Sequence, residues 1–259
     1  MKHIKRKLLF ETDSDSIRFE GPEFEILENI EKGIDPSILS DKKQHVAFLQ
    51  LDCNKTTRGF ILNVQGKNYI LPIPDLTLVY FSNAQNNLNL SKDFKTKLLE
   101  KLDPTKPGMI PPIHELYNYY GTVCSTIINL FTAIESFINQ LIPEDYHYKR
   151  ITKKSTEIFN YKQILENIDF KTKVTKIIPE ITQKDFFKGN SPTSQKLWNL
   201  KDFRDEIVHT KPEDKILLYR DLIKKALNYK FDEAVSSVAK YLNYHKENYV
   251  VECDCGEDF

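Results

Sequence analysis

Short runs of alternating apolar and polar residues dominate the first ninety or so residues. DLTLVYFSN at 75–83 alternates in this way, and HVAFLQLDC at 45–53 is apolar on both sides of an expected strand. KHIKRKLLFET, SIRFEG and FEILENI are short and compatible with strands. RGFILNVQGKNYILPI contains two such runs around a turn at Gln65–Gly66–Lys67. A period of two is typical of strands, and a glycine-containing turn between two runs indicates a hairpin. We therefore expect a small, mostly antiparallel β domain.

A proline-rich segment follows this region. Residues 91–103 are predicted to form a short helix with Ser91 as its N-cap. The next segment, 103-DPTKPGMIPP-112, holds four prolines and a glycine. Such a composition favours a linker, so we expect the β-rich domain to cover 1–105 and a second domain to begin near 110.

Apolar positions recur at three- and four-residue steps from Ile113 onward. The first series continues to Leu141 and stops at Pro143, which predicts a helix of roughly 30 residues. Shorter helices are expected at 159–168, 169–178, 193–209, 213–228 and 231–246. The predicted fold class is therefore α+β, with an all-α bundle over 110–248 and a loose acidic tail at 249–259.

Charge and cysteine content change this picture little. The 37 Lys and Arg balance the 37 Asp and Glu, but residues 148–190 are basic and residues 231–259 are acidic. The basic middle either attracts phosphate or is a solvated helical surface. Four cysteines, no signal-peptide pattern and no uninterrupted apolar span predict a cytoplasmic protein without a membrane segment. Cys253 and Cys255 lack a known zinc spacing, so we expect no metal there.

The segment DFRDEIVHTK at 202–211 carries the candidate chemistry. If Leu200 and Phe203 face the core, then about 100° per residue places Trp198, Asp205 and His209 together on the opposite face. Asp205 lies four residues before His209, so its carboxylate can reach the imidazole. An exposed tryptophan beside polar groups indicates that another helix, a second subunit or a ligand covers this face. The segment could equally be an internal polar network that caps the helix end.

RDEIVH at 204–209 resembles the signature of HEPN domains, a family of α-helical bundles in which an arginine precedes a histidine by five to seven positions. LFTAIESFINQLI at 130–142 is similar to the first long helix of that family, with Glu135 and Asn139 among apolar residues. The resemblance covers about residues 111–245 and leaves the N-terminal domain unassigned. Glu135 and Asn139 either face the motif or are ordinary polar-face residues.

The resemblance implies a metal-independent endoribonuclease, without a cofactor, whose site forms across a two-fold dimer. His209 would move protons at the 2′-hydroxyl or the leaving 5′-oxygen, Arg204 would hold the scissile phosphate, and Asp205 would orient His209. The products would carry a 2′,3′-cyclic phosphate and a 5′-hydroxyl. The expected supporting or RNA-binding residues are Trp198, Lys201, Glu135 and Asn139.

The partners that the resemblance implies are RNA, a second copy of the chain and an antitoxin or regulatory protein, since such enzymes act as toxins or antiviral effectors. The alternative is a non-catalytic HEPN-like module that dimerises or binds a nucleotide or protein. A third possibility is an unrelated helical scaffold in which RDEIVH is structural.

Overall fold

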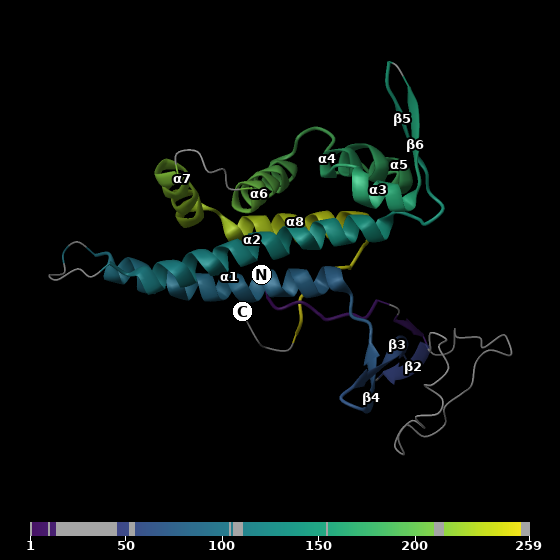
Figure 1. Cartoon of the computed structure of the whole chain (residues 1–259), viewed down its shortest axis with the longest axis horizontal. Coiled ribbons are helices and arrows are strands. Elements are labelled where there is room, and N and C mark those ends of the chain that lie inside the picture. Colours follow the sequence, from purple (N-terminus) through teal and green to yellow (C-terminus); the bar gives the residue numbers. More distant parts are fainter. Residues whose placement is uncertain are drawn as a thin grey trace. The chain divides into compact units, whose positions relative to one another are not determined.

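The computed structural model describes residues 2–9, 11–13, 46–51, 55–103, 105, 111–153, 155–209 and 215–254. The chain forms two compact units, one of residues 6–76 and one of residues 1–5 with 77–259. The division therefore falls at Leu76–Thr77, earlier than the proline-rich segment where the sequence placed it. Figure 1 shows the small sheet in the first unit and the helices of the second.

The smaller unit is an antiparallel sheet of four strands, β1 (Thr12–Asp13), β2 (Val46–Leu51), β3 (Lys55–Val64) and β4 (Lys67–Pro72). β3 pairs with each of the other three. The predicted hairpin is confirmed, because Leu62 of β3 faces Tyr69 of β4 across the turn. Positive φ angles at Gln65 (51°) and Gly66 (77°) give the turn the backbone twist that two-residue hairpins need. The runs SIRFEG and FEILENI lie outside the described residues.

The strand predicted at 75–83 is wrong, because this segment begins the helix α1 (Leu76–Lys101). The buried residues of α1 include Leu78, Phe81 and Leu88, which follow helical steps. A short apolar run satisfies both periodicities, and only packing along the whole helix decides between them. The helix predicted at 91–103 is the second half of α1, so Ser91 is an interior residue whose hydroxyl donates to the Leu88 carbonyl.

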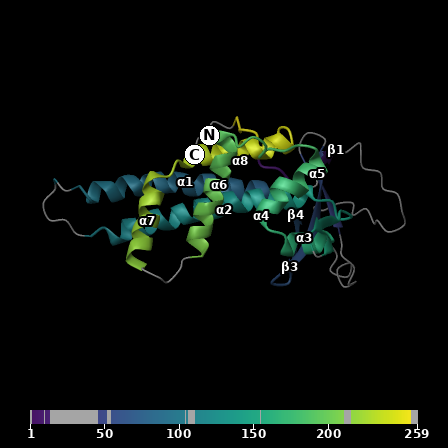
Figure 2. The same cartoon turned by 90° about the horizontal axis from the view of Figure 1, so that it is seen from above.

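The larger unit is built around α2 (Ile113–Leu141), and the predicted long helix is confirmed. The other helical segments are α3 (Tyr161–Asn167), α4 (Phe170–Thr172), the π-helical η4 (Lys173–Ile177), α5 (Ile178–Thr182), α6 (Pro192–Val208), α7 (Lys215–Asn228) and α8 (Phe231–His245). α2, α6 and α8 contact one another and enclose much of the core. α6 runs across α2 when the molecule is seen from above (Figure 2).

The C-terminal part is not all-α, because a hairpin of β5 (Tyr148–Ile151) and β6 (Thr156–Phe159) interrupts it. The hairpin projects from the helices in Figure 1. Within the hairpin, the guanidinium of the exposed Arg150 lies 4.8 Å from the centre of the Phe159 ring and pairs with the carboxylate of Glu157. Sequence patterning missed the hairpin because its strands, YKRI and TEIF, are only four residues long and half of their residues are polar.

The expectation of a loose tail is wrong for residues 249–254. Tyr249 and Val250 are buried, and Glu252 forms a β-bridge with Ile4. The backbone N–H of Cys253 donates to the His3 carbonyl at 2.6 Å. The two ends of the chain thus hold each other through backbone hydrogen bonds, which depend little on side-chain identity and leave little trace in the sequence.

Among the described helices, α2 alone is long and apolar enough to cross a membrane. Half of its most apolar stretch is nevertheless buried inside the fold. This is the pattern of the central helix of a soluble protein, whose apolar face is covered by other helices.

The imidazole of His245 lies in an aromatic cluster with Phe137 and Tyr241, at ring distances of 6.5 and 4.9 Å. Burial, assisted by the nearby ammonium of Lys184, lowers the pKa of His245 to about 4. The pKa of this histidine is therefore lower in the folded chain than in the unfolded chain. The stabilisation from the neutral imidazole is complete above about pH 6.5 and is lost as the pH falls through about 4.

We expect protonation of His245 to lower the free energy of unfolding by about 2–3 kcal/mol as the pH falls from 7 to 4. Urea unfolding of wild type and His245→Gln across that range measures the effect, and the variant should lose less stability on acidification. His147→Gln, at an exposed position, is the matched control. Equal pH dependence in all three proteins would contradict the prediction.

Candidate functional site

The helix α6 presents the motif at its C-terminal end. Ser191 caps its start by accepting a hydrogen bond from the Ser194 backbone N–H, and Pro192 occupies the first turn. Leu200 and Phe203 are fully buried, as the helical phase predicted. His209 ends the helix as its C-cap, and its backbone N–H donates to the Asp205 carbonyl at 2.8 Å.

Trp198 is covered by its own chain. Its ring lies 5.9 Å from Phe170 and 4.9 Å from Phe187, between ring centroids, and it packs against the core. No second subunit is needed to cover this tryptophan, so that part of the sequence argument for a dimer does not hold. Of the three covers expected for this face, namely another helix, a second subunit or a ligand, the first applies to Trp198.

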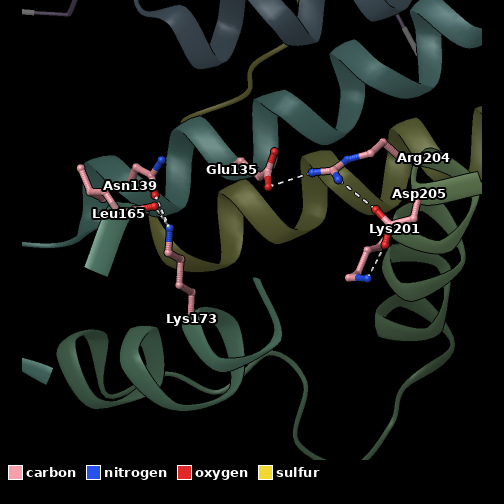
Figure 3. Close-up of polar contacts among 7 residues, drawn as sticks. All are labelled: Glu135, Asn139, Leu165, Lys173, Lys201, Arg204 and Asp205. Atoms are coloured by element: carbon pink, nitrogen blue, oxygen red, sulfur yellow. Dashed lines mark hydrogen bonds and ion pairs between the residues drawn. The ribbon is translucent and has the colours of Figure 1, made fainter. Parts of the chain in front are cut away.

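Arg204 is held between α2 and its own helix (Figure 3). Its guanidinium donates to Glu135 Oε1 at 3.0 Å and to Asp205 Oδ1 at 2.9 Å. The guanidinium carbon also lies 4.3 Å from the centre of the Phe131 ring, a cation–π contact. Of the two possibilities for Glu135, the structure has the one in which it faces the motif. A guanidinium has five N–H donors, so these two bonds leave others for a ligand.

Asp205 does not orient His209 through its carboxylate in this arrangement. Its two oxygens accept from Arg204 and from Lys201, the latter at 2.6 Å. The side chain of His209 is exposed, and no hydrogen bond to its ring is recorded among the described residues. The imidazole is therefore accessible at the helix end and is not consumed by an internal network.

One pocket of about 490 Å³ brings the predicted residues together. Arg204, Asp205, His209, Lys201, Glu135 and Asn139 all line it, whereas Trp198 does not. The remaining lining residues are three polar side chains and five apolar ones: Glu166, Asp169, Lys173, Phe131, Ile138, Leu165, Ile168 and Phe170. The cations Lys173, Lys201 and Arg204 stand against four carboxylates, so this pocket is not a strongly basic cleft.

Lys173 is the site residue that sequence reasoning missed. It starts the π-helical segment η4 and is only 8% exposed. Its ammonium donates to Asn139 Oδ1 at 3.3 Å and to the Leu165 carbonyl at 3.0 Å. Burial lowers the pKa of Lys173, and the carboxylates of Glu135 and Asp169 oppose that shift. The one feature of the sequence that could have indicated Lys173 is its spacing, because it lies three residues after Phe170 and four before Ile177, at a core-facing helical position.

Within the described ranges, no three His, Cys, Asp or Glu side chains cluster as ligands for a metal ion would. Cys253 has a free thiol, and Cys255 lies outside the described residues. No protein-family model, curated protein or solved structure matches the chain.

Proposed function

We propose that the protein is a metal-independent endoribonuclease of HEPN type, with a composite site formed by two copies of the chain. The observation that carries the proposal is that Arg204 and His209 line one pocket, with the imidazole exposed and without a partner among the described residues. An anchored guanidinium beside an accessible imidazole suits phosphodiester cleavage by an internal nucleophile.

The proposed reaction needs only groups of the RNA and of the protein. The 2′-oxygen attacks the adjacent phosphorus while one His209 imidazole accepts the 2′-hydroxyl proton. The bond from phosphorus to the 5′-oxygen breaks, and the His209 imidazolium of the second copy gives that oxygen a proton. The products are a 2′,3′-cyclic phosphate and a 5′-hydroxyl.

Arg204 stabilises the charge that develops on the phosphoryl oxygens. Its contacts with Glu135 and Phe131 hold the guanidinium in place before RNA arrives, so little ordering is lost on binding. Lys201 lies one turn earlier on α6 and adds a second positive charge, while Asp205 joins the two cations. Asp205 thus acts on Arg204 and Lys201 and not on His209.

The product ends test this mechanism. Purified protein is incubated with total RNA in EDTA, and the fragments are treated with polynucleotide kinase and labelled ATP. Fragments with 5′-hydroxyl ends take up label without prior phosphatase treatment. Labelling only after phosphatase treatment would show 5′-phosphate ends and reject the proposed chemistry.

Exposed apolar side chains flank the motif and suit a contact with a second copy. Val208 is 50% exposed immediately before His209, and Ile216 and Tyr219 at the start of α7 are 82% and 48% exposed. A contact between copies through these residues would bring two motifs near each other and remove apolar surface from water.

We expect Ile216→Glu to weaken this dimer by about tenfold or more, because a carboxylate would be buried in an apolar contact. Light scattering over a concentration series measures the shift. Ile151→Glu, at a 74% exposed position on the β5–β6 hairpin, is the matched control. A dimer unaffected by Ile216→Glu would place the interface elsewhere.

A second candidate function is nucleotide or protein binding without cleavage. It is favoured by the two carboxylates on Arg204 and by the balanced charge of the pocket, since a phosphate must compete with both acids. RNA or nucleotide binding without any cleavage in EDTA would support this function over the nuclease.

As a nuclease, the protein would act on RNA in the cytoplasm as a toxin or an antiviral, abortive-infection effector. An antitoxin or regulatory protein would then be needed to restrain it. The four-stranded sheet of the smaller unit is a place where such a protein could bind. Its β3–β4 hairpin exposes Phe60, Leu62 and Tyr69, which are 41%, 40% and 48% accessible.

A further inference from the structure

A second polar cluster lies in the same pocket, away from Arg204 (Figure 3). Lys173 from η4 meets Asn139 of α2 and the backbone carbonyl of Leu165 in α3. Three separate elements therefore meet at the ammonium of Lys173, and this residue as a whole is only 8% exposed. A lysine is rarely buried unless its charge has a use or a partner.

Among the described residues, the hydrogen bonds of this cluster leave N–H donors of Lys173 and Asn139 unused. Oδ1 of Asn139 accepts from Lys173, which leaves the Nδ2 amide group as a donor. An ammonium has three N–H bonds, and Lys173 has two acceptors among the described residues. Lys173 and Asn139 thus offer two neighbouring donors at the pocket.

Apolar side chains and the carboxylates of Glu166 and Asp169 together line this part of the pocket, which we call the slot. Ile138 and Ile168 are buried, and Leu165 and Phe170 pack against the core beside them. Apolar side chains beside a few fixed polar groups suit a flat organic ligand, and the whole pocket, at about 490 Å³, lies within the usual range of volumes for a ligand site.

The spacing along α2 relates this slot to the phosphate-binding arginine. Glu135 holds Arg204 and Asn139 holds Lys173, and these two residues are one turn apart, about 6 Å along the axis. A phosphate at Arg204 would therefore leave its nucleoside within reach of Lys173.

We propose that Lys173 and Asn139 form a base-recognition subsite for a nucleobase with two adjacent acceptors, guanine at O6 and N7 or cytosine at O2 and N3. Adenine and uracil lack such a pair, because a donor group adjoins their acceptors. This inference rests on the proposed function, since the nucleotide reaches the slot through a phosphate at Arg204.

The test measures binding of GMP, CMP, AMP and UMP to the full-length chain by calorimetry. We expect GMP or CMP to bind at least about tenfold more tightly than AMP and UMP. Comparing the affinities of GMP and CMP then shows which of guanine and cytosine the subsite takes. Equal affinities for all four, or no binding at millimolar concentration, would overturn the proposal.

Two variants separate recognition from folding. Lys173→Met removes the ammonium at similar length, and Lys176→Met at an exposed position of η4 is its control. Asn139→Asp keeps an acceptor for Lys173 but replaces the free donor with an oxygen, so the chain should fold. Both site variants should abolish the preference, and an unchanged preference in Asn139→Asp would contradict the assignment.

Failure of this inference can be told apart from failure of the nuclease proposal. Cleavage in EDTA without a preference for guanine or cytosine at the cut site removes the subsite and leaves the nuclease. Selective GMP or CMP binding without cleavage removes the nuclease and leaves the subsite.

Discussion

Alanine at Arg204 or at His209 is expected to lower the rate of RNA cleavage in EDTA by about 10²- to 10⁴-fold. The first change removes the cation that balances charge on the phosphoryl oxygens, and the second removes the group that moves the protons. Neither change should unfold the chain, because His209 is exposed and the two carboxylates on Arg204 are 40% and 34% accessible. Initial rates on a labelled RNA measure the loss, and circular dichroism checks folding.

Arg220→Ala and His147→Ala are the matched controls. Both remove the same residue types from exposed positions outside the pocket. We expect both controls to cleave at the wild-type rate. Equal cleavage by Arg204→Ala, His209→Ala and wild type would reject the nuclease proposal. Mixing His209→Ala with wild type also tests the composite site, since a mixed dimer keeps only one of the two imidazoles that the reaction uses and should cleave more slowly than the wild-type dimer.

Phe203→Ala is expected to reduce the free energy of unfolding by about 3–5 kcal/mol, because it removes a large buried ring and leaves a cavity. Phe203 is fully buried on α6, 5.1 Å from the Tyr229 ring between centroids, with the ammonium of Lys225 4.8 Å from its centre. These contacts join the motif helix to α7 and to the short segment between α7 and α8. Urea unfolding followed by circular dichroism measures the loss.

Asp202→Ala is the control for this substitution, because Asp202 is exposed beside Phe203 on the same helix. Its effect should stay within about 0.5 kcal/mol. A Phe203→Ala protein as stable as wild type would mean that α6 does not depend on this ring for its position. Loss of stability with retained activity at low temperature would separate the packing role of Phe203 from the chemistry of Arg204.

Long elements with a consistent pattern could be predicted from the sequence. The bounds expected for α2 and α6 agree closely with Ile113–Leu141 and Pro192–Val208, since many apolar steps, prolines and caps all indicate the same helix. The β3–β4 hairpin was equally clear, because its turn needs the positive φ angles that Gly66 permits. Short segments were not predictable, as the strand expected at 75–83 and the overlooked β5–β6 hairpin show.

At the candidate site, too, the sequence determined some features and the tertiary structure decided the others. The spacing of Arg204 and His209 on one helix, and the presence of Glu135 and Asn139 on another, are properties of the sequence by itself. Only the tertiary structure decided that Glu135 binds Arg204, that Asp205 binds Lys201 and not His209, and that Phe170 and Phe187 cover Trp198.

Lys173 shows the physical reason why the contacts of the site could not be predicted from the sequence. Periodicity tells which residues share a face of one helix, because it follows from the geometry of a single backbone. Which side chains meet depends on how separate helices pack, and Lys173 becomes a site residue only where η4, α2 and α3 come together. The sequence alone determined the helices and the candidate motif, and the packing of those helices decided which charges pair, which ring is buried and where a ligand can bind.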